Sequence, residues 1–187
     1  MGRPKKKVEI IEKVAPHTIK KCELIEHYVD EWARKILGFN GMNGRDGSKG
    51  IIYIDCMSNS GLYYDSEDNL VDGTALRVAK RLNDILPKYP DKMGYVMFND
   101  ISQEKIDCLK REIDKLKLSN ITFRFNCGDG NEFIRELDIK ELQKKCGTLL
   151  LYDPYQATID WDAITPYLNI WGEVIINHMV SDTNRGA

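Results

Sequence analysis

Residues 18–37 carry apolar side chains at steps of three and four residues, which is the spacing of one face of an amphipathic helix. Pro16 and Thr18 are typical of a helix start, and Gly38 is typical of a helix end. Residues 40–48 hold three glycines among mostly polar residues, so we expect an irregular connector there. The apolar positions of the helix are Cys22, Ile25, Tyr28, Val29, Trp32 and Ile36.

From residue 51 onward, short apolar runs alternate with helical patterns. Unbroken apolar runs are typical of strands that are covered on both faces, as in a parallel sheet between two helical layers. The pattern therefore predicts an α/β, Rossmann-like fold in residues 51–187, preceded by residues 1–50 with the N-terminal helix, all in one compact domain. The predicted strands are 51–54, 95–98, 121–125, 148–152 and 173–176, and the predicted helices are 74–86, 103–117, 161–169 and a broken helix over 132–145.

Composition narrows the class of protein. A chain of 187 residues is long enough for one full core, and a net charge of −2 gives no overall field that would attract nucleic acid. The basic residues Arg3, Lys5, Lys6 and Lys7 are expected to form a solvated tail rather than a phosphate-contacting arm. No apolar segment approaches the roughly 20 residues needed to cross a bilayer. These features predict a soluble, cytoplasmic protein.

The five cysteines are scattered without CxxC spacing, and the three histidines match no zinc pattern, so no metal site is expected. The cysteines are expected to be reduced and at least partly buried. Trp161 and Trp171 are expected to pack in the core or against helices, and His178 is expected to be a hydrogen-bonded structural residue.

Acidic residues follow four of the predicted strands. In an open parallel sheet, ligands bind beyond the carboxyl ends of the strands, so these positions are the candidate site. Each residue alone has a structural explanation, because Asp100 can cap a helix while Asp129 and Asp153 can form turns. Four aspartates at equivalent positions favour a shared ligand. They are Asp55, Asp100, Asp129 and Asp153.

A nucleoside fits this pattern of strand ends. Asp100, at the end of the second strand, is placed to accept hydrogen bonds from both ribose hydroxyls. Asp129, after Gly128, is placed to accept from an adenine amino group. The loop of residues 55–61 must let its backbone approach the ligand, which requires small residues and positive φ angles. Ser58 and Gly61 are small, and asparagine, here Asn59, tolerates the left-handed conformation better than most residues.

The ordered set of motifs resembles the three-Cys-motif partner proteins, a bacterial and phage family related to class I methyltransferases. The resemblance covers nearly the whole chain, from the helix that contains Trp32 to the last predicted strand. Residues 53–63 are similar to the family's YIDxFAGxGxY, and residues 73–76 look like its GSPL helix start. The further blocks, in order, are Phe98-Asn99-Asp100, Cys127-Gly128-Asp129, Leu151-Tyr152-Asp153-Pro154-Tyr155 and Ile175-Ile176-Asn177-His178-Met179.

The resemblance implies S-adenosylmethionine as the cofactor. Asp153-Pro154-Tyr155 resembles the Asp/Asn-Pro-Pro-Tyr/Phe signature of amino-group methyltransferases, in which the acidic or amide side chain accepts from the target amine and the aromatic ring stacks on the substrate, often a flipped base. The chain departs from the family in the loop, where Cys56, Ser58 and Asn59 replace glycine and alanine. It also has one proline where the signature has two. The implied cofactor-binding residues are Asp55, Ser58, Asn59, Gly61, Asp100, Gly128 and Asp129.

Two hypotheses about function follow from this resemblance. The first is an S-adenosylmethionine-dependent methyltransferase-like enzyme acting on an amino group of nucleic acid. The alternative is a catalytically inactive Rossmann-like partner of a Cys-rich, radical-SAM-like protein, which is consistent with the glycine-poor loop. A nicotinamide-dependent dehydrogenase is disfavoured, because the loop lacks the required glycine fingerprint. The sequence supplies five strands, so the last two strands of the seven-stranded methyltransferase sheet are expected to be missing.

Overall fold

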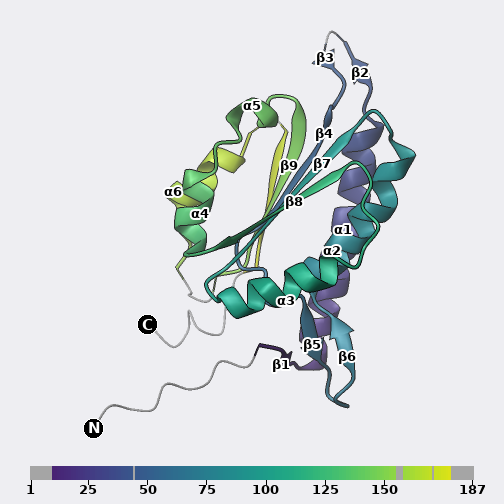
Figure 1. The fold of residues 1–187 in the computed structure, drawn as a ribbon. Coiled ribbons are helices and arrows are strands. Elements are labelled where there is room, and N and C mark those ends of the chain that lie inside the picture. The colour runs from purple at the N-terminus through teal and green to yellow at the C-terminus, as the bar shows by residue number, and fades with distance from the viewer. Residues whose placement is uncertain (1–9, 44, 155–157, 170, 178–187) are drawn as a thin grey trace.

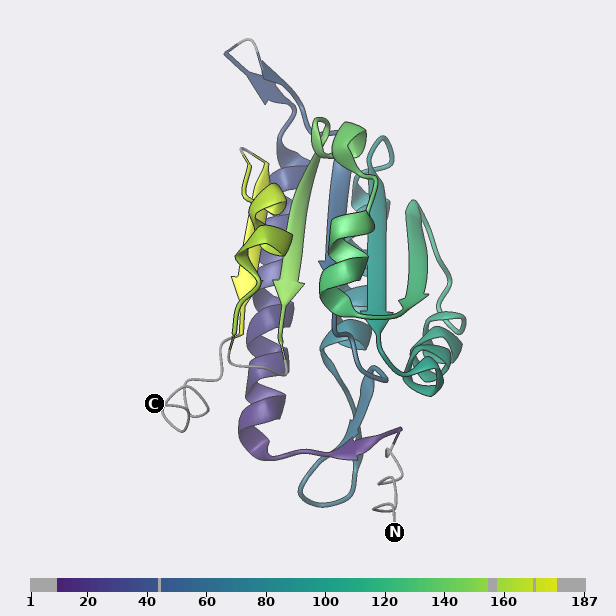
Figure 2. The ribbon, with the colours of Figure 1, turned by 90° about the vertical axis from the view of Figure 1, so that its left-hand side faces the viewer.

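The computed structural model describes residues 10–43, 45–154, 158–169 and 171–177, and its centre is a five-stranded, all-parallel sheet. The spatial order of the strands is β10-β9-β4-β7-β8, which can be followed from left to right in Figure 2. In register, Ile52 lies opposite Tyr95 on one side and Thr148 on the other. The strands are β4 (Gly50–Asp55), β7 (Met93–Asp100), β8 (Ile121–Cys127), β9 (Cys146–Tyr152) and β10 (Gly172–Ile176).

Helices cover both faces of this sheet, as predicted (Figure 1). Because side chains alternate along a strand, Ile51 and Tyr53 of β4 pack against one helical layer, and Ile52 and Ile54 pack against the other. The first layer is α1 (Pro16–Gly38), α2 (Thr74–Ile85) and α3 (Gln103–Ile113). The second layer is α4 (Gly130–Glu136), α5 (Lys140–Gln143) and α6 (Trp161–Ile164), with the 3₁₀ turn η2 (Thr165–Tyr167) after α6; a further turn, η1 (Leu86–Lys88), follows α2.

Two predicted helices are shorter than the pattern suggested. The helix predicted over 103–117 ends at Ile113, because the next backbone bonds, from Lys115 to Glu112 and from Leu116 to Ile113, span three residues and tighten the last turn. The helix predicted over 161–169 likewise gives way to η2 after Ile164.

The irregular connector predicted over residues 40–48 is not observed. This segment contains a small antiparallel ladder. Strands β2 (Gly41–Met42) and β3 (Arg45–Asp46) pair with Met42 opposite Arg45. Asn43 adopts a left-handed conformation with φ 53° in the turn, so an asparagine supplies the backbone angle that a tight hairpin requires.

A second small sheet, not predicted from the sequence, lies at the carboxyl edge of the main sheet (Figure 1). It consists of β1 (Glu12–Lys13), β5 (Leu62–Tyr64) and β6 (Leu70–Asp72) in the order β1-β5-β6. Glu12 also forms an ion pair with Lys105 of α3 at 2.5 Å, and that lysine is almost fully buried. The N-terminal strand is thereby tied to the edge where ligands are expected.

All five cysteines are free thiols, and four of them are buried, in agreement with the prediction; Cys127 is exposed. Within the described ranges, no helix combines the length and the apolar character required to cross a membrane.

Candidate functional site

The strand order places the acidic strand ends side by side. From β4 the chain steps outward through β7 to β8, then crosses back to β9 on the other side of β4. The boundary between β4 and β9 is therefore the topological switch point, where open α/β sheets bind ligands. Asp55 ends β4 in register with Leu151, Asp153 lies two residues after that position, and Asp100 ends the neighbouring strand β7. The sheet thus brings three of the four predicted aspartates together at one place.

Asp55 is the most perturbed acid of this edge. Its side chain is almost entirely buried, and its Oδ1 accepts a hydrogen bond from the backbone N–H of Met57 at 3.1 Å. Burial raises the pKa of Asp55 from 3.8 to about 7, and the negative charges of Asp153 and Asp100 add to the rise, whereas the Met57 hydrogen bond and Lys21 oppose it. Mutual repulsion among these carboxylates means that a cation bound between them would be stabilised.

The loop after β4 has the backbone conformation that the nucleoside hypothesis requires. Asn59 has φ 58° and Gly61 has φ 74°, so both adopt the left-handed region. A Cβ on Gly61 would also lie 2.5 Å from Cδ1 of Leu109, so a larger residue there would force the buried Leu109 side chain to shift. The departure from glycine at position 59 therefore does not prevent the turn, since asparagine adopts it and its Oδ1 accepts from the N–H of Ser60 at 2.6 Å.

Asp100 holds this loop in place. Its Oδ2 accepts from the backbone N–H of Asn59 at 3.0 Å, and its Oδ1 accepts from that of Ser102 at 2.9 Å. Only 3% of the residue is exposed. Ser58 is bound to the same strand end, because its N–H and its hydroxyl both donate to the carbonyl of Asn99. Ribose binding by Asp100 remains a prediction, and bracing of the loop of residues 55–61 is a second role that the structure adds.

The end of β8 is connected to the same network. The Asn99 amide donates to the carbonyls of Cys56 and Gly128, and the N–H of Gly128 donates to the carbonyl of Asp100 at 3.1 Å. Asp129 is exposed and is the N-cap of α4, where its Oδ1 accepts from the N–H groups of the first turn. Its structural role is thus established, and its second oxygen has no hydrogen-bond partner among the described residues.

Asp153 receives two hydrogen bonds that the sequence did not predict. Lys21 of α1 pairs with Oδ2 at 2.8 Å, and Asn177, just after β10, donates from Nδ2 to Oδ1 at 2.6 Å. The three residues come from distant parts of the chain, so no local pattern could have joined them. Pro154 is buried. Tyr155 of the predicted signature and His178 lie outside the described residues.

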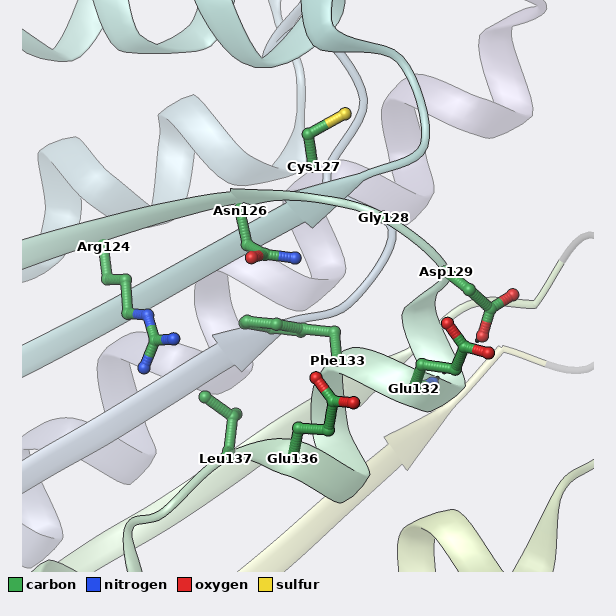
Figure 3. A pocket seen from close by; sticks show the side chains of 9 residues that line it. All are labelled: Arg124, Asn126, Cys127, Gly128, Asp129, Glu132, Phe133, Glu136 and Leu137. Carbon is green, nitrogen blue, oxygen red and sulfur yellow. Dashed lines mark hydrogen bonds between the residues drawn. The ribbon is translucent and has the colours of Figure 1, made fainter.

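A polar hollow of about 290 Å³ borders the open edge of β8 (Figure 3). Arg124 and Asn126 of β8 and Glu132, Phe133 and Glu136 of α4 line it, and Figure 3 shows Arg124 and Glu136 extending into the same space. Cys127 points away from the helix in this view. The hollow shares Asp129 and Gly128 with the predicted adenine end of the site, so it is the described cavity nearest to that prediction.

Trp161 and Trp171, both predicted to pack against other residues, differ in how much of each residue is exposed. Trp171 is half-buried and contacts Phe39 edge-on, with ring centroids 5.5 Å apart, so its packing role is confirmed. It lies at the amino end of the sheet, because its carbonyl accepts from the N–H of Thr148 near the start of β9. The packing role predicted for Trp161 is wrong, since 56% of that residue is exposed. Trp161 begins the four-residue helix α6, whose buried side chains are those of Ala163 and Ile164, so a different side of the helix faces the core.

The described residues contain no group of three histidine, cysteine or acidic side chains arranged to hold a metal ion. A comparison with models of known protein families finds none that matches the chain, and a comparison with curated proteins finds no relative. The residues at the carboxyl edge of the sheet are therefore the basis for any statement about function.

Proposed function

We propose that this protein binds S-adenosylmethionine at the carboxyl edge of β4, β7 and β9 and is an amino-group methyltransferase. The observation that carries the proposal is the convergence of Asp55, Asp100 and Asp153 from three neighbouring parallel strands at the topological switch point. The resemblance to class I methyltransferases supports the same ligand, and it implies an amino group of nucleic acid as the acceptor.

The residues at this edge fit such a cofactor in backbone and in charge. Asn59 and Gly61 have left-handed backbone conformations in the loop that follows β4. The residues of this turn are small, so a ligand could approach the backbone there. Burial is the main cause of the rise in the pKa of Asp55 to about 7, and the negative charges of Asp153 and Asp100 add to it; a ligand with a sulfonium and an ammonium group would relieve that repulsion.

S-adenosylmethionine would supply an electrophilic methyl group, and the chain would supply position. Asp153 is half-buried and held by Lys21 and Asn177, so its carboxylate has one orientation. A carboxylate fixed in this way can accept a hydrogen bond from an incoming amine and direct the nitrogen lone pair toward the methyl group. Asp55 would contribute to cofactor binding through its charge and through the Met57 turn.

One observation favours the alternative of a catalytically inactive partner. Ser58, Asn59 and Ser60 are all buried, and their backbone N–H groups donate to protein oxygens. A loop whose donors are already satisfied binds a ligand with fewer new hydrogen bonds. The association with a Cys-rich, radical-SAM-like protein that the resemblance implies would then not require turnover.

Isothermal titration calorimetry with S-adenosylmethionine and S-adenosylhomocysteine tests the proposal. We expect saturable binding by the wild-type protein and binding weakened by about five- to ten-fold in Asp153→Asn, because one carboxylate near the cation is neutralised. Asp114→Asn, at the exposed end of α3, is the matched control and should bind like the wild type.

Each outcome of this titration has a distinct meaning. A folded sample that binds neither ligand at millimolar concentration would overturn the proposal. Binding without methyl transfer to nucleic acid or protein would select the inactive partner. Saturable binding of NADH, followed by its fluorescence, would instead place the chain among the dehydrogenases that use the same fold.

A further inference from the structure

A second cavity, of about 440 Å³, lies beside the candidate site, where α4 and α6 begin. Its volume is in the range of pockets that hold small ligands. Trp161 is the aromatic residue among the described residues that line it, and 56% of that residue is exposed. The other lining residues are Asn131, Thr158, Ile159, Asp160 and Asp162.

Hydrogen bonds from the last residue of β9 frame this cavity. The Tyr152 hydroxyl donates to Oδ1 of Asn131 at 2.9 Å and accepts from the N–H of Asp160 at 3.2 Å. Tyr152 itself is fully buried and immediately precedes Asp153. The cavity is therefore built on the same strand end as the residue proposed to orient the methyl acceptor, and its walls are held in place before any ligand binds.

The charge around the cavity is negative. Asp160 caps α6 and pairs with Arg135, so these two charges compensate each other. Asp162 is exposed and forms no ion pair with any described residue. Asp129 and Glu132 add two exposed carboxylates at the adjacent start of α4. A phosphate group approaching this surface would be repelled, whereas a cation would be attracted.

An exposed tryptophan beside an unpaired carboxylate is a recognition surface for a cation. The face of an indole ring attracts ammonium and guanidinium groups, and tryptophan does so more strongly than the other aromatic residues. We propose that this cavity binds the lysine ammonium or arginine guanidinium group of a polypeptide, with the cation over Trp161 and paired with Asp162. Binding of such a side chain in this cavity does not depend on the proposed function, whose implied methyl acceptor is an amino group of nucleic acid.

The test uses the cofactor-free protein and short peptides with blocked termini. Binding of a lysine peptide, an arginine peptide, an acetyl-lysine peptide and a single-stranded oligonucleotide is measured by calorimetry and by quenching of tryptophan fluorescence. The protein variants are Trp161→Ala, Trp161→Phe and Asp162→Asn, with Leu168→Ala as the control, because Leu168 is equally exposed and does not line the cavity. Circular dichroism confirms that each variant is folded.

We expect the lysine and arginine peptides to bind and the acetyl-lysine peptide not to bind, and we expect any binding of the oligonucleotide to be independent of Trp161. Trp161→Ala should weaken peptide binding by about five-fold and Trp161→Phe by less, because phenylalanine keeps a weaker cation–π face. Asp162→Asn should weaken it by about three-fold, more in low salt than in high salt. Leu168→Ala should have no effect.

Three results would overturn the inference: equal binding of the acetyl-lysine peptide, peptide binding that does not change in Trp161→Ala, or oligonucleotide binding that depends on Trp161. The last would make the cavity a base-stacking site. Titration of S-adenosylmethionine into the same variants separates this inference from the proposed function. If the peptides bind through Trp161 and the cofactor does not bind at all, the proposed function fails and the cation site stands.

Discussion

Replacement of Asp55 by asparagine should stabilise the protein, and increasingly so as the pH rises. Asp55 is buried at the end of β4, and its pKa is raised from 3.8 to about 7, chiefly by burial and further by Asp153 and Asp100. Between about pH 4 and pH 7, Asp55 therefore keeps its proton in the folded protein, whereas the same carboxyl group has lost its proton in the unfolded chain. Stability accordingly falls as the pH rises through that window, because the native state binds more protons than the unfolded state.

The size of the effect follows from the two pKa values. A carboxyl group with a pKa of about 7 when folded and 3.8 when unfolded destabilises the fold by about 4 kcal/mol at pH 8, but by only about 2 kcal/mol at pH 5. Asparagine has nearly the same shape, keeps an oxygen that can accept from the N–H of Met57, and carries no charge. The Asp55→Asn variant should therefore regain most of the stability that the wild type loses at each of these two pH values.

Urea denaturation of the wild type and Asp55→Asn at pH 5, 6, 7 and 8 measures this difference. We expect Asp55→Asn to be the more stable at every pH, with an advantage at pH 8 that exceeds the advantage at pH 5 by roughly 2 kcal/mol. Asp114→Asn, which removes an exposed carboxylate, should show no comparable trend. An advantage that is the same at all four pH values, or an Asp55→Asn protein less stable than the wild type at pH 8, would refute the reasoning.

Three further substitutions test the loop and the end of β8 by the same denaturation assay. Gly61→Ala should cost about 1–3 kcal/mol, because φ is 74° and the new methyl group meets Leu109; unchanged stability would show that the turn is not required. Asn59→Ala should destabilise more than Asn59→Gly, since both lose the hydrogen bond to Ser60 but only alanine is strained at φ 58°; the reverse order would contradict the left-handed assignment. Asp129→Ala should cost about 1 kcal/mol through loss of the N-cap of α4, whereas an unchanged midpoint would mean that the cap is dispensable.

The five strands of the main sheet and the helices between them were predictable from the sequence, because the evidence for each lies within a few neighbouring residues. An unbroken run such as residues 148–152 indicates a buried strand, and the three- and four-residue periodicity indicates a helix. The small sheet was not predictable. Its strands contain two or three residues each, and Glu12 pairs with Tyr63 across a long stretch of chain.

The candidate site also contains residues that could be predicted from the sequence and residues that could not. Asp55, Asp100 and Asp153 could be placed together because all parallel strands end at one edge, which is a rule of topology rather than of contacts. The contacts of Lys21 and Asn177 with Asp153 could not be predicted, because they depend on how α1 and β10 pack against β9.

The exposure of Trp161 was hidden for a different reason. The local pattern of residues 161–169 predicts a helix, but it does not say which side chains of that helix face the core, and the structure shows Ala163 and Ile164 buried and Trp161 exposed. Side-chain partners and exposure depend on tertiary packing, so neither could be derived from the local pattern.

The most direct test of the central claim is a crystal structure of the protein grown with S-adenosylhomocysteine. The ligand should lie across the carboxyl ends of β4 and β7, with its amino-acid end near Asp55 and Asp153 and its adenine toward Asp129. A nucleoside bound anywhere else on the molecule, or a well-ordered structure with no ligand at this edge under saturating conditions, would contradict the claim.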